Sequence, residues 1–328
     1  MSSVRPVGPP PPYDPECGAV LDGLPPFPPL TIASLTFLRE AEFIPRPSNA
    51  DLARDGTYAV EERSVPGPAG APDVTLIICR PTGVTGPAPA LYYTHGGGMV
   101  AGTSRDALDS VLDLAQPLGA AVVSVEYRLA PETPHPGPVE DCYAGLSWAA
   151  EHAAELGIDD ERIVLVGGSA GGGIAAALAL MARDRGAPTL AGQLLMCPML
   201  DDRNDSPSVQ QMAHLRMWNR SDNELGWTAL LGESRGGPDV SAYAAPARAS
   251  DLTGLPPTFI DVGSADTFRD EDVDFASRIC LAGGVAELHV WPGGFHGFDG
   301  MVPGAALSRA AVAARASWLA RLLAWVGP

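Results

Sequence analysis

Apolar residues follow two periodicities along this chain, and the two alternate. Short runs that are apolar almost throughout predict strands at residues 57–64, 73–80, 90–94, 120–126, 162–166, 190–197, 258–262 and 286–291. Apolar positions at helical spacing predict helices at residues 31–43, 139–156, 169–183, 273–282 and 305–325. Strands that alternate with helices and have no polar face pack into parallel sheets covered on both sides. The pattern therefore indicates an α/β fold, with a mostly parallel sheet of about eight strands flanked by helices.

Two segments depart from this alternation. Residues 1–30 are rich in proline, including the run Pro9 to Pro12, and proline fixes φ and donates no hydrogen bond. We therefore expect an arm there that is extended or draped over another part of the molecule. Residues 200–256 are typical of turns and helices rather than of a strand–helix unit. A long insertion of this kind inside an α/β domain predicts a lid or cap.

Composition and charge exclude some classes of partner. The chain has 328 residues, of which 46% are hydrophobic and 18% charged, and this balance is typical of a globular protein. Its net charge is −18, and the basic residues include no lysine. Because such an acidic surface repels phosphate backbones, we expect no nucleic-acid partner. No run reaches the roughly 18–20 apolar residues that cross a bilayer, and residues 1–16 lack the apolar core of a signal peptide. We therefore expect neither a membrane span nor export.

The cysteines are odd in number, widely spaced and include no C-x-x-C pair. They are Cys17, Cys79, Cys142, Cys197 and Cys280. This pattern argues against a disulfide framework or a zinc site, and it predicts reduced thiols in a cytoplasmic protein.

One serine lies in a run of glycines where a strand is expected to become a helix. Gly167 to Gly171 reads G-G-S-A-G and matches the G-x-S-x-G pattern around Ser169. A nucleophile at the tip of so tight a turn needs an unusual φ and ψ, and small neighbours avoid clashes with the strand and helix. Glycine-rich turns also bind phosphate, but this one lacks the G-K-[ST] sequence of a P-loop.

A second glycine run, His95-Gly96-Gly97-Gly98, follows the strand predicted at 90–94. Consecutive glycines let backbone N–H groups point into one space, so this loop can supply part of an oxyanion hole. A flexible turn is the alternative reading, and the coexisting serine turn makes it the weaker one.

A serine hydroxyl needs a base, and six histidines compete for that role. They are His95, His135, His152, His214, His289 and His296. We favour His296, because it lies in a glycine-flanked loop after the last predicted strand, where catalytic residues of α/β sheets gather. For the acid that orients the imidazole we choose Asp266, just past the end of a strand, over Asp261, which lies inside that strand.

Together these motifs resemble the hormone-sensitive-lipase-like group of α/β-hydrolases, the bacterial esterases with an H-G-G-G motif. The resemblance spans roughly residues 90–298 and includes "HGGG", "YRLAPE", "GGSAGG", "CPMLDDR", "DTFRDE" and "HGF". It implies an α/β-hydrolase fold with a helical cap. The expected divisions are an arm and part of the cap at 1–50, the core at 51–198 and 236–328, and a cap insertion at 199–235.

The resemblance also implies roles for individual residues. Ser169, Asp266 and His296 correspond to the family's triad. The oxyanion amides correspond to Gly97, Gly98 and Ala170, and the segment from Tyr127 to Glu132 braces the architecture. One position departs from the family, because Gly168 stands where Asp or Thr usually precedes the serine.

The expected activity is hydrolysis of small carboxylic esters with short- to medium-chain acyl groups, without a metal or cofactor. Cap residues that could line the substrate pocket, or else pack the cap onto the core, are Met199, Met212, Leu215, Met217, Trp218 and Trp227. An amidase, lactonase or acyltransferase would use the same triad, and a small-molecule receptor would use the same fold. The resemblance is also compatible with a homodimer built through the last strand and helix.

Overall fold

The computed structural model describes residues 7–25, 30–40 and 46–325 of the chain. The strands are β1 (Tyr58–Val65), β2 (Val74–Pro81), β3 (Ala88–Thr94), β4 (Ala121–Glu126), β5 (Ile158–Gly168), β6 (Gly192–Met196), β7 (Thr258–Ala265) and β8 (Ala286–Phe295). The helices are α1 (Pro15–Gly23), α2 (Leu35–Glu40), α3 (Asn49–Leu52), α4 (Leu108–Ala115), α5 (Gly137–Glu151), α6 (Ala153–Leu156), α7 (Ala170–Arg185), α8 (Pro207–Gln211), α9 (Arg220–Leu231), α10 (Arg269–Leu281), α11 (Phe298–Met301) and α12 (Ala306–Trp325).

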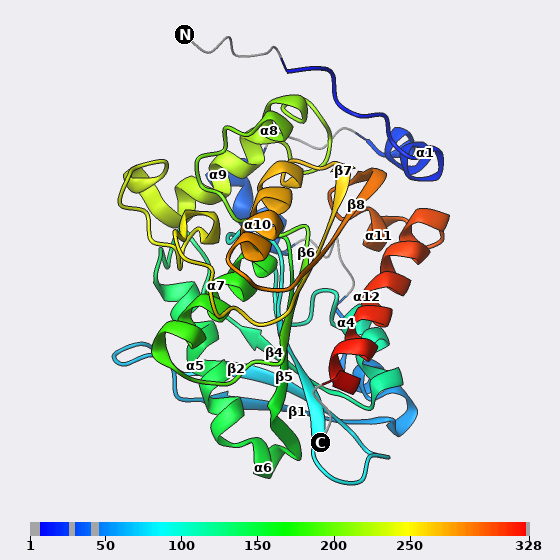
Figure 1. The fold of residues 1–328 in the computed structure, drawn as a ribbon, viewed down its shortest axis with the longest axis vertical. Helices are drawn as coiled ribbons and strands as arrows, with labels where there is room; N and C mark the ends of the chain where they lie inside the picture. The colour runs from blue at the N-terminus through cyan, green and yellow to red at the C-terminus, as the bar shows by residue number, and fades with distance from the viewer. Residues whose placement is uncertain (1–6, 26–29, 41–45, 326–328) are drawn as a thin grey trace.

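The strands form one eight-stranded sheet in the order β1-β2-β4-β3-β5-β6-β7-β8 (Figure 1). β2 pairs antiparallel with both β1 and β4, and every other pair in the sheet is parallel. Helices α5, α7 and α10 pack on one face, and α4 and α12 on the other, so the central strands are buried on both sides. This arrangement explains the near-continuous apolar runs and confirms the predicted fold class.

Of the two forms expected for the arm at residues 1–30, the extended chain is wrong for residues 15–23, which form α1. Proline is accepted at the first position of a helix, where its missing N–H would have no intrahelical partner. The Asp14 carboxylate caps the helix by accepting the N–H groups of Glu16 and Cys17 at 2.9 and 3.2 Å. Residues 1–6 and 26–29 of that expectation lie outside the described residues.

Two predicted helices also differ from the structure. The helix expected at residues 31–43 is described as a short 3₁₀ turn followed by α2, and residues 41–43 lie outside the described part. The helix expected at 139–156 is divided into α5 and α6 at His152, where the backbone leaves the helical region.

Helix α1 and the residues just before it contact the carboxyl-terminal end of β8. The N–H of Asp14 donates to the carbonyl of Gly293 at 2.9 Å, and the ring of Tyr13 meets the ring of Phe295 edge-on at 6.0 Å. Leu21 is buried in a cluster with Phe295 and other residues around the end of β8. The amino-terminal helix therefore packs against the chain that bears His296.

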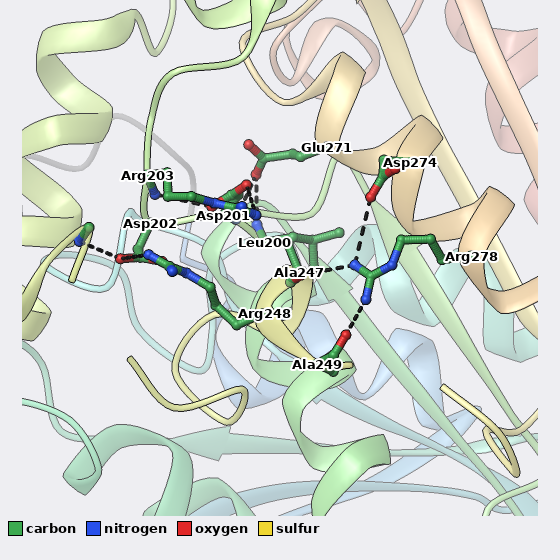
Figure 2. Close-up of polar contacts among 11 residues, drawn as sticks. Leu200, Asp201, Asp202, Arg203, Ala247, Arg248, Ala249, Glu271, Asp274 and Arg278 are labelled. Atoms are coloured by element: carbon green, nitrogen blue, oxygen red, sulfur yellow. Dashed lines mark hydrogen bonds and ion pairs between the residues drawn. The ribbon is translucent and has the colours of Figure 1, made fainter. Parts of the chain in front are cut away.

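The insertion after β6, which is the segment between β6 and β7, is anchored to the core near both of its ends (Figure 2). Glu271 of α10 accepts the N–H of Leu200 at 2.7 Å. The fully buried carboxylate of Asp202 accepts Arg248 Nε at 2.7 Å, and Arg278 donates to two carbonyls of the segment that ends the insertion. These contacts fix where the insertion leaves the sheet and where it returns.

Candidate active site

Ser169 occupies the turn between β5 and α7 with φ of 56° and ψ of −124°, a conformation that is strained for a residue with a side chain. Two neighbouring glycines are required by space. A Cβ on Gly167 would lie 2.3 Å from the carbonyl oxygen of Gly171, and a Cβ on Gly171 would lie 2.0 Å from that of Thr94. Only glycine therefore fits at these two positions, where the turn lies against β3 and where its two ends approach each other.

Gly168 is different, because nothing in its surroundings demands a glycine. A Cβ at this position would meet only the Met196 residue, at 3.7 Å and beyond, which is ordinary van der Waals contact. The departure from the family's usual Asp or Thr therefore leaves room beside Ser169 rather than relieving a clash.

The structure brings Ser169, His296 and Asp266 into one hydrogen-bonded row. His296 Nε2 lies 2.9 Å from Ser169 Oγ, and His296 Nδ1 lies 2.9 Å from Asp266 Oδ2. The other carboxylate oxygen of Asp266 accepts the N–H of Phe268 at 2.9 Å, and Asp266 is 1% exposed. The three residues follow β5, β7 and β8, whose carboxyl ends meet at one edge of the parallel sheet. A hydroxyl, an imidazole and a buried carboxylate in this order can activate an oxygen nucleophile.

The glycine loop lies directly against this row. A Cβ on Gly96 would be 3.5 Å from Ser169 Cβ, and Gly97 and Gly98 have φ values of 114° and 62°. The carbonyl of Gly97 accepts the N–H of Ala101 at 2.9 Å, which tightens the turn. Ala170 is the first residue of α7, so its N–H is among those a helix leaves without an intrahelical acceptor. These amides are suited to bind a developing oxyanion beside Ser169.

Comparison with known families agrees with this geometry. The family model described as the alpha/beta hydrolase fold matches residues 91–300. The chain belongs to the α/β-hydrolase family. The expected resemblance to hormone-sensitive-lipase-like esterases is thereby confirmed.

Among curated proteins, this α/β-hydrolase is 35% identical over 285 residues to Esterase LipI of Mycobacterium tuberculosis, covering 81% of this chain and 85% of the relative. It is 39% identical over 249 residues to Carboxylesterase NlhH of the same species, covering 73% and 75%. Among solved structures, a Bacterial Heroin Esterase superposes with a TM-score of 0.88 at 42% identity, covering 95% of this chain and 98% of that one.

Side chains of the "YRLAPE" segment support the glycine loop of this hydrolase. Tyr127 donates its hydroxyl to the carbonyl of His95 at 2.8 Å and stacks on the His95 ring at 4.1 Å. Glu132 forms an ion pair with Arg39 of α2, and Arg39 also donates to the carbonyl of Val100 at 2.7 Å. The loop is thus held from the core by Tyr127 and from the N-terminal region by Arg39.

The residues that we did not favour as the acid or the base have other hydrogen-bond partners. Asp261 accepts Arg315 Nε at 2.8 Å and Trp291 Nε1 at 3.0 Å, so its carboxylate is engaged away from the imidazole of His296. His152 bonds the carbonyl of Trp148, and His289 bonds Glu287.

The residues expected to line the substrate pocket or to pack the cap differ in how deeply they are buried. Met199, Met212 and Trp227 are at most 1% exposed, while Leu215 and Met217 are partly buried. Trp218 reaches the candidate active site, because its Cη2 lies 2.0 Å from the point that a Cβ on Gly98 would occupy. Its ring centroid is 6.3 Å from that of His296. The indole therefore covers the glycine loop beside the imidazole.

Sequence reasoning gave no role to Cys197, although its thiol lies beside His296 and Asp266. The signal that could have found it is its position directly after β6, at the same sheet edge as the residues that follow β5 and β7.

The pH profile of ester hydrolysis is expected to report the environment of His296. Burial alone would lower its pKa, but the Asp266 carboxylate and Cys197 outweigh burial and raise the pKa well above the ordinary value of 6.5. The base must be neutral to accept a proton, so kcat/KM should rise with pH along a limb centred above 6.5. Rates measured in a pH-stat with an uncharged ester test this, and a limb centred at or below the ordinary histidine value contradicts it.

No helix within the described ranges combines the length and the apolar character needed to cross a membrane.

Proposed function

We propose that Ser169, His296 and Asp266 are the catalytic residues of this carboxylic ester hydrolase, and that its substrates carry short- to medium-chain acyl groups. The observation that carries the proposal is the unbroken row from Ser169 Oγ through both ring nitrogens of His296 to the buried carboxylate of Asp266. Relatives named esterase and carboxylesterase support the reaction class.

In the proposed mechanism, His296 Nε2 takes the hydroxyl proton of Ser169 as Oγ attacks the ester carbonyl carbon. The N–H groups of Gly97, Gly98 and Ala170 stabilise the oxyanion that forms. The imidazolium, held by Asp266, then gives its proton to the leaving alcohol, and an acyl-enzyme remains. Water repeats the sequence, so that the acid is released and Ser169 regains its proton.

We infer that the N-terminal arm and the insertion after β6 form a cap over this site. Hydrogen bonds from two side chains of the insertion to the arm support the inference. Arg216 of the insertion donates to the carbonyls of Leu21 and Leu24 at 2.7 and 2.8 Å, and Gln211 donates to the carbonyl of Pro9 at 3.1 Å.

We also propose that the protein is located in a reducing cytoplasm. All five cysteines are free, which supports this location.

Within this cap, Trp218 is proposed to limit the length of the acyl group. Its indole N–H donates to Asn223 at 3.3 Å, and its backbone carbonyl accepts the hydroxyl of Thr267 at 2.6 Å. The residue is therefore held by its indole N–H and by its backbone, with the ring over Gly98 and near the imidazole of His296. A rigid aromatic wall at this point favours small acyl groups.

A series of p-nitrophenyl esters of increasing acyl length tests this proposal. For the wild type, kcat/KM is expected to be highest with short to medium chains. Trp218→Ala should raise kcat/KM for longer chains relative to acetate by about 10-fold or more, since one methylene in a pocket already changes selectivity by that order. Trp325→Ala, at a residue 77% exposed at the end of α12, is the matched control.

Two results of this series would count against the proposal. A wild-type maximum at long acyl chains would reject the assigned substrate class. An unchanged ratio between long and short esters in Trp218→Ala would show that the indole does not bound the acyl group.

A further inference from the structure

Three side chains of types that bind metals lie close together at the candidate active site. One ligand atom each from Cys197, Asp266 and His296 lies within 4.8 Å of the other two. The three residues follow β6, β7 and β8, which are neighbours in the sheet. The N–H of Cys197 donates to the carbonyl of Asp261 at 2.7 Å, and its φ of 38° fixes the backbone in the left-handed region. The thiol is therefore held in place beside the imidazole.

A second observation points to a cation in the same region. Asp272 of α10 is fully buried, and neither of its carboxylate oxygens has a hydrogen-bond partner among the residues described. Asp272 interacts electrostatically with Asp266 and Cys197, so it lies beside the same cluster. The buried Arg315 is already paired with Asp261 and Asp299. Asp272 is therefore a buried carboxyl group beside the cluster that has no partner of its own among the residues described.

We propose that Cys197, His296 and Asp266 form a binding site for a soft divalent metal ion of the Zn²⁺ or Cd²⁺ type, and that its occupation inhibits the enzyme. Thiolate, imidazole and carboxylate are the ligands that Zn²⁺ takes in proteins. The set is not visible as a sequence motif, because its members come from three different strand ends.

The distances allow such a site with a small adjustment. Zinc binds sulfur at about 2.3 Å and nitrogen or oxygen at about 2.0–2.2 Å, so ligand atoms of a tetrahedral site lie roughly 3.5 Å apart. The Nδ1 of His296 and Oδ2 of Asp266 are already 2.9 Å apart. The widest separation in the cluster, at most 4.8 Å, has to close by about 1 Å, and the 2.9 Å pair has to open by less than that.

Binding has a defined chemical consequence. The metal replaces the thiol proton of Cys197, which passes to the solvent, and it takes the place of the proton on His296 Nδ1, which moves to Nε2 so that the imidazole stays neutral. The imidazole then coordinates the ion, loses its orientation by Asp266 and no longer accepts the proton of Ser169. Only this last step rests on the proposed function, since metal binding itself does not require catalysis.

The activity experiment measures ester hydrolysis against Zn²⁺ concentration in the wild type, Cys197→Ala and Cys280→Ala. The wild type and Cys280→Ala should be inhibited alike, and a chelator should restore their activity, because Cys280 is an exposed thiol away from the cluster. Cys197→Ala should need at least about 10-fold more Zn²⁺, since even outer-shell changes weaken metal sites by 10–100-fold. Equal sensitivity of Cys197→Ala and the wild type would overturn the proposal.

The binding experiment separates this proposal from the proposed function. Calorimetric titration of Zn²⁺, or thiolate charge-transfer absorbance with Cd²⁺, is measured on Ser169→Ala and on Ser169→Ala combined with Cys197→Ala. One ion should bind per chain of the first protein, and binding to the second should be at least about 10-fold weaker. Binding by Ser169→Ala remains measurable even if the wild type hydrolyses no ester. Absence of Cys197-dependent binding at millimolar metal would refute the site.

Discussion

Ser169→Ala is expected to lower kcat for ester hydrolysis by roughly 10³–10⁶-fold, which is the usual loss when a triad member is removed. The reason is that, among the residues described, no other hydroxyl lies within hydrogen-bond distance of His296 Nε2. The residual rate should reflect binding and the amides of the glycine loop, which do not depend on the hydroxyl. Initial rates with a short aryl ester measure the effect.

A covalent label makes this experiment specific for the residue. A fluorophosphonate probe should label the wild type and not Ser169→Ala. Ser317→Ala, at an exposed position of α12, is the matched control and should keep both label and activity. Undiminished hydrolysis by a folded Ser169→Ala protein would contradict the nucleophile assignment, and with it the acyl-enzyme mechanism.

Asp266→Asn is expected to lower kcat by about 10⁴-fold, because an amide no longer holds the imidazole in the tautomer that accepts the serine proton. Asp261→Asn is the informative comparison, since both acids are buried and lie on or just after β7. Asp261 bonds Arg315 and Trp291, so this substitution should reduce the free energy of unfolding, by up to about 3–5 kcal/mol for a broken buried ion pair.

Each variant therefore needs both kinetic and thermal unfolding measurements. Asp266→Asn should keep a midpoint near that of the wild type and lose turnover. Asp261→Asn should unfold at a lower temperature and turn over normally well below its midpoint. Full activity of Asp266→Asn together with an inactive but folded Asp261→Asn would reverse the assignment of the acid.

The sheet could be predicted from sequence because its strands are buried on both faces and their apolar runs are nearly unbroken. The turn at Ser169 was predictable for a related reason, since a strand, a tight turn and a helix each leave a local signal. Helix α1 was not, because proline content predicts an extended chain, whereas Asp14 and the position of Pro15 decide the structure. The N-cap of this helix is a single side chain, and proline content carries no information about it.

Some residues of the candidate site were likewise predictable from sequence, and others were not. His296 and Asp266 were predictable from the rule that catalytic groups follow the strands of a parallel sheet. The environment of Cys197 depends on β6 lying two strands from β8, which is a property of the strand order rather than of any local pattern. Pocket residues were also hard to select, because apolar side chains such as Met199 and Trp218 look alike in a sequence and differ only in what covers them.

The contact between α1 and the end of β8 has a practical consequence for handling the enzyme. Tyr13 touches Phe295, which immediately precedes the imidazole, and Arg216 ties α1 to the insertion. An affinity tag or fusion partner joined at the amino terminus is therefore close in sequence to a helix that contacts the strand preceding the proposed general base, His296. Rate constants from tagged and tag-free preparations should be compared before either is taken as the property of the enzyme.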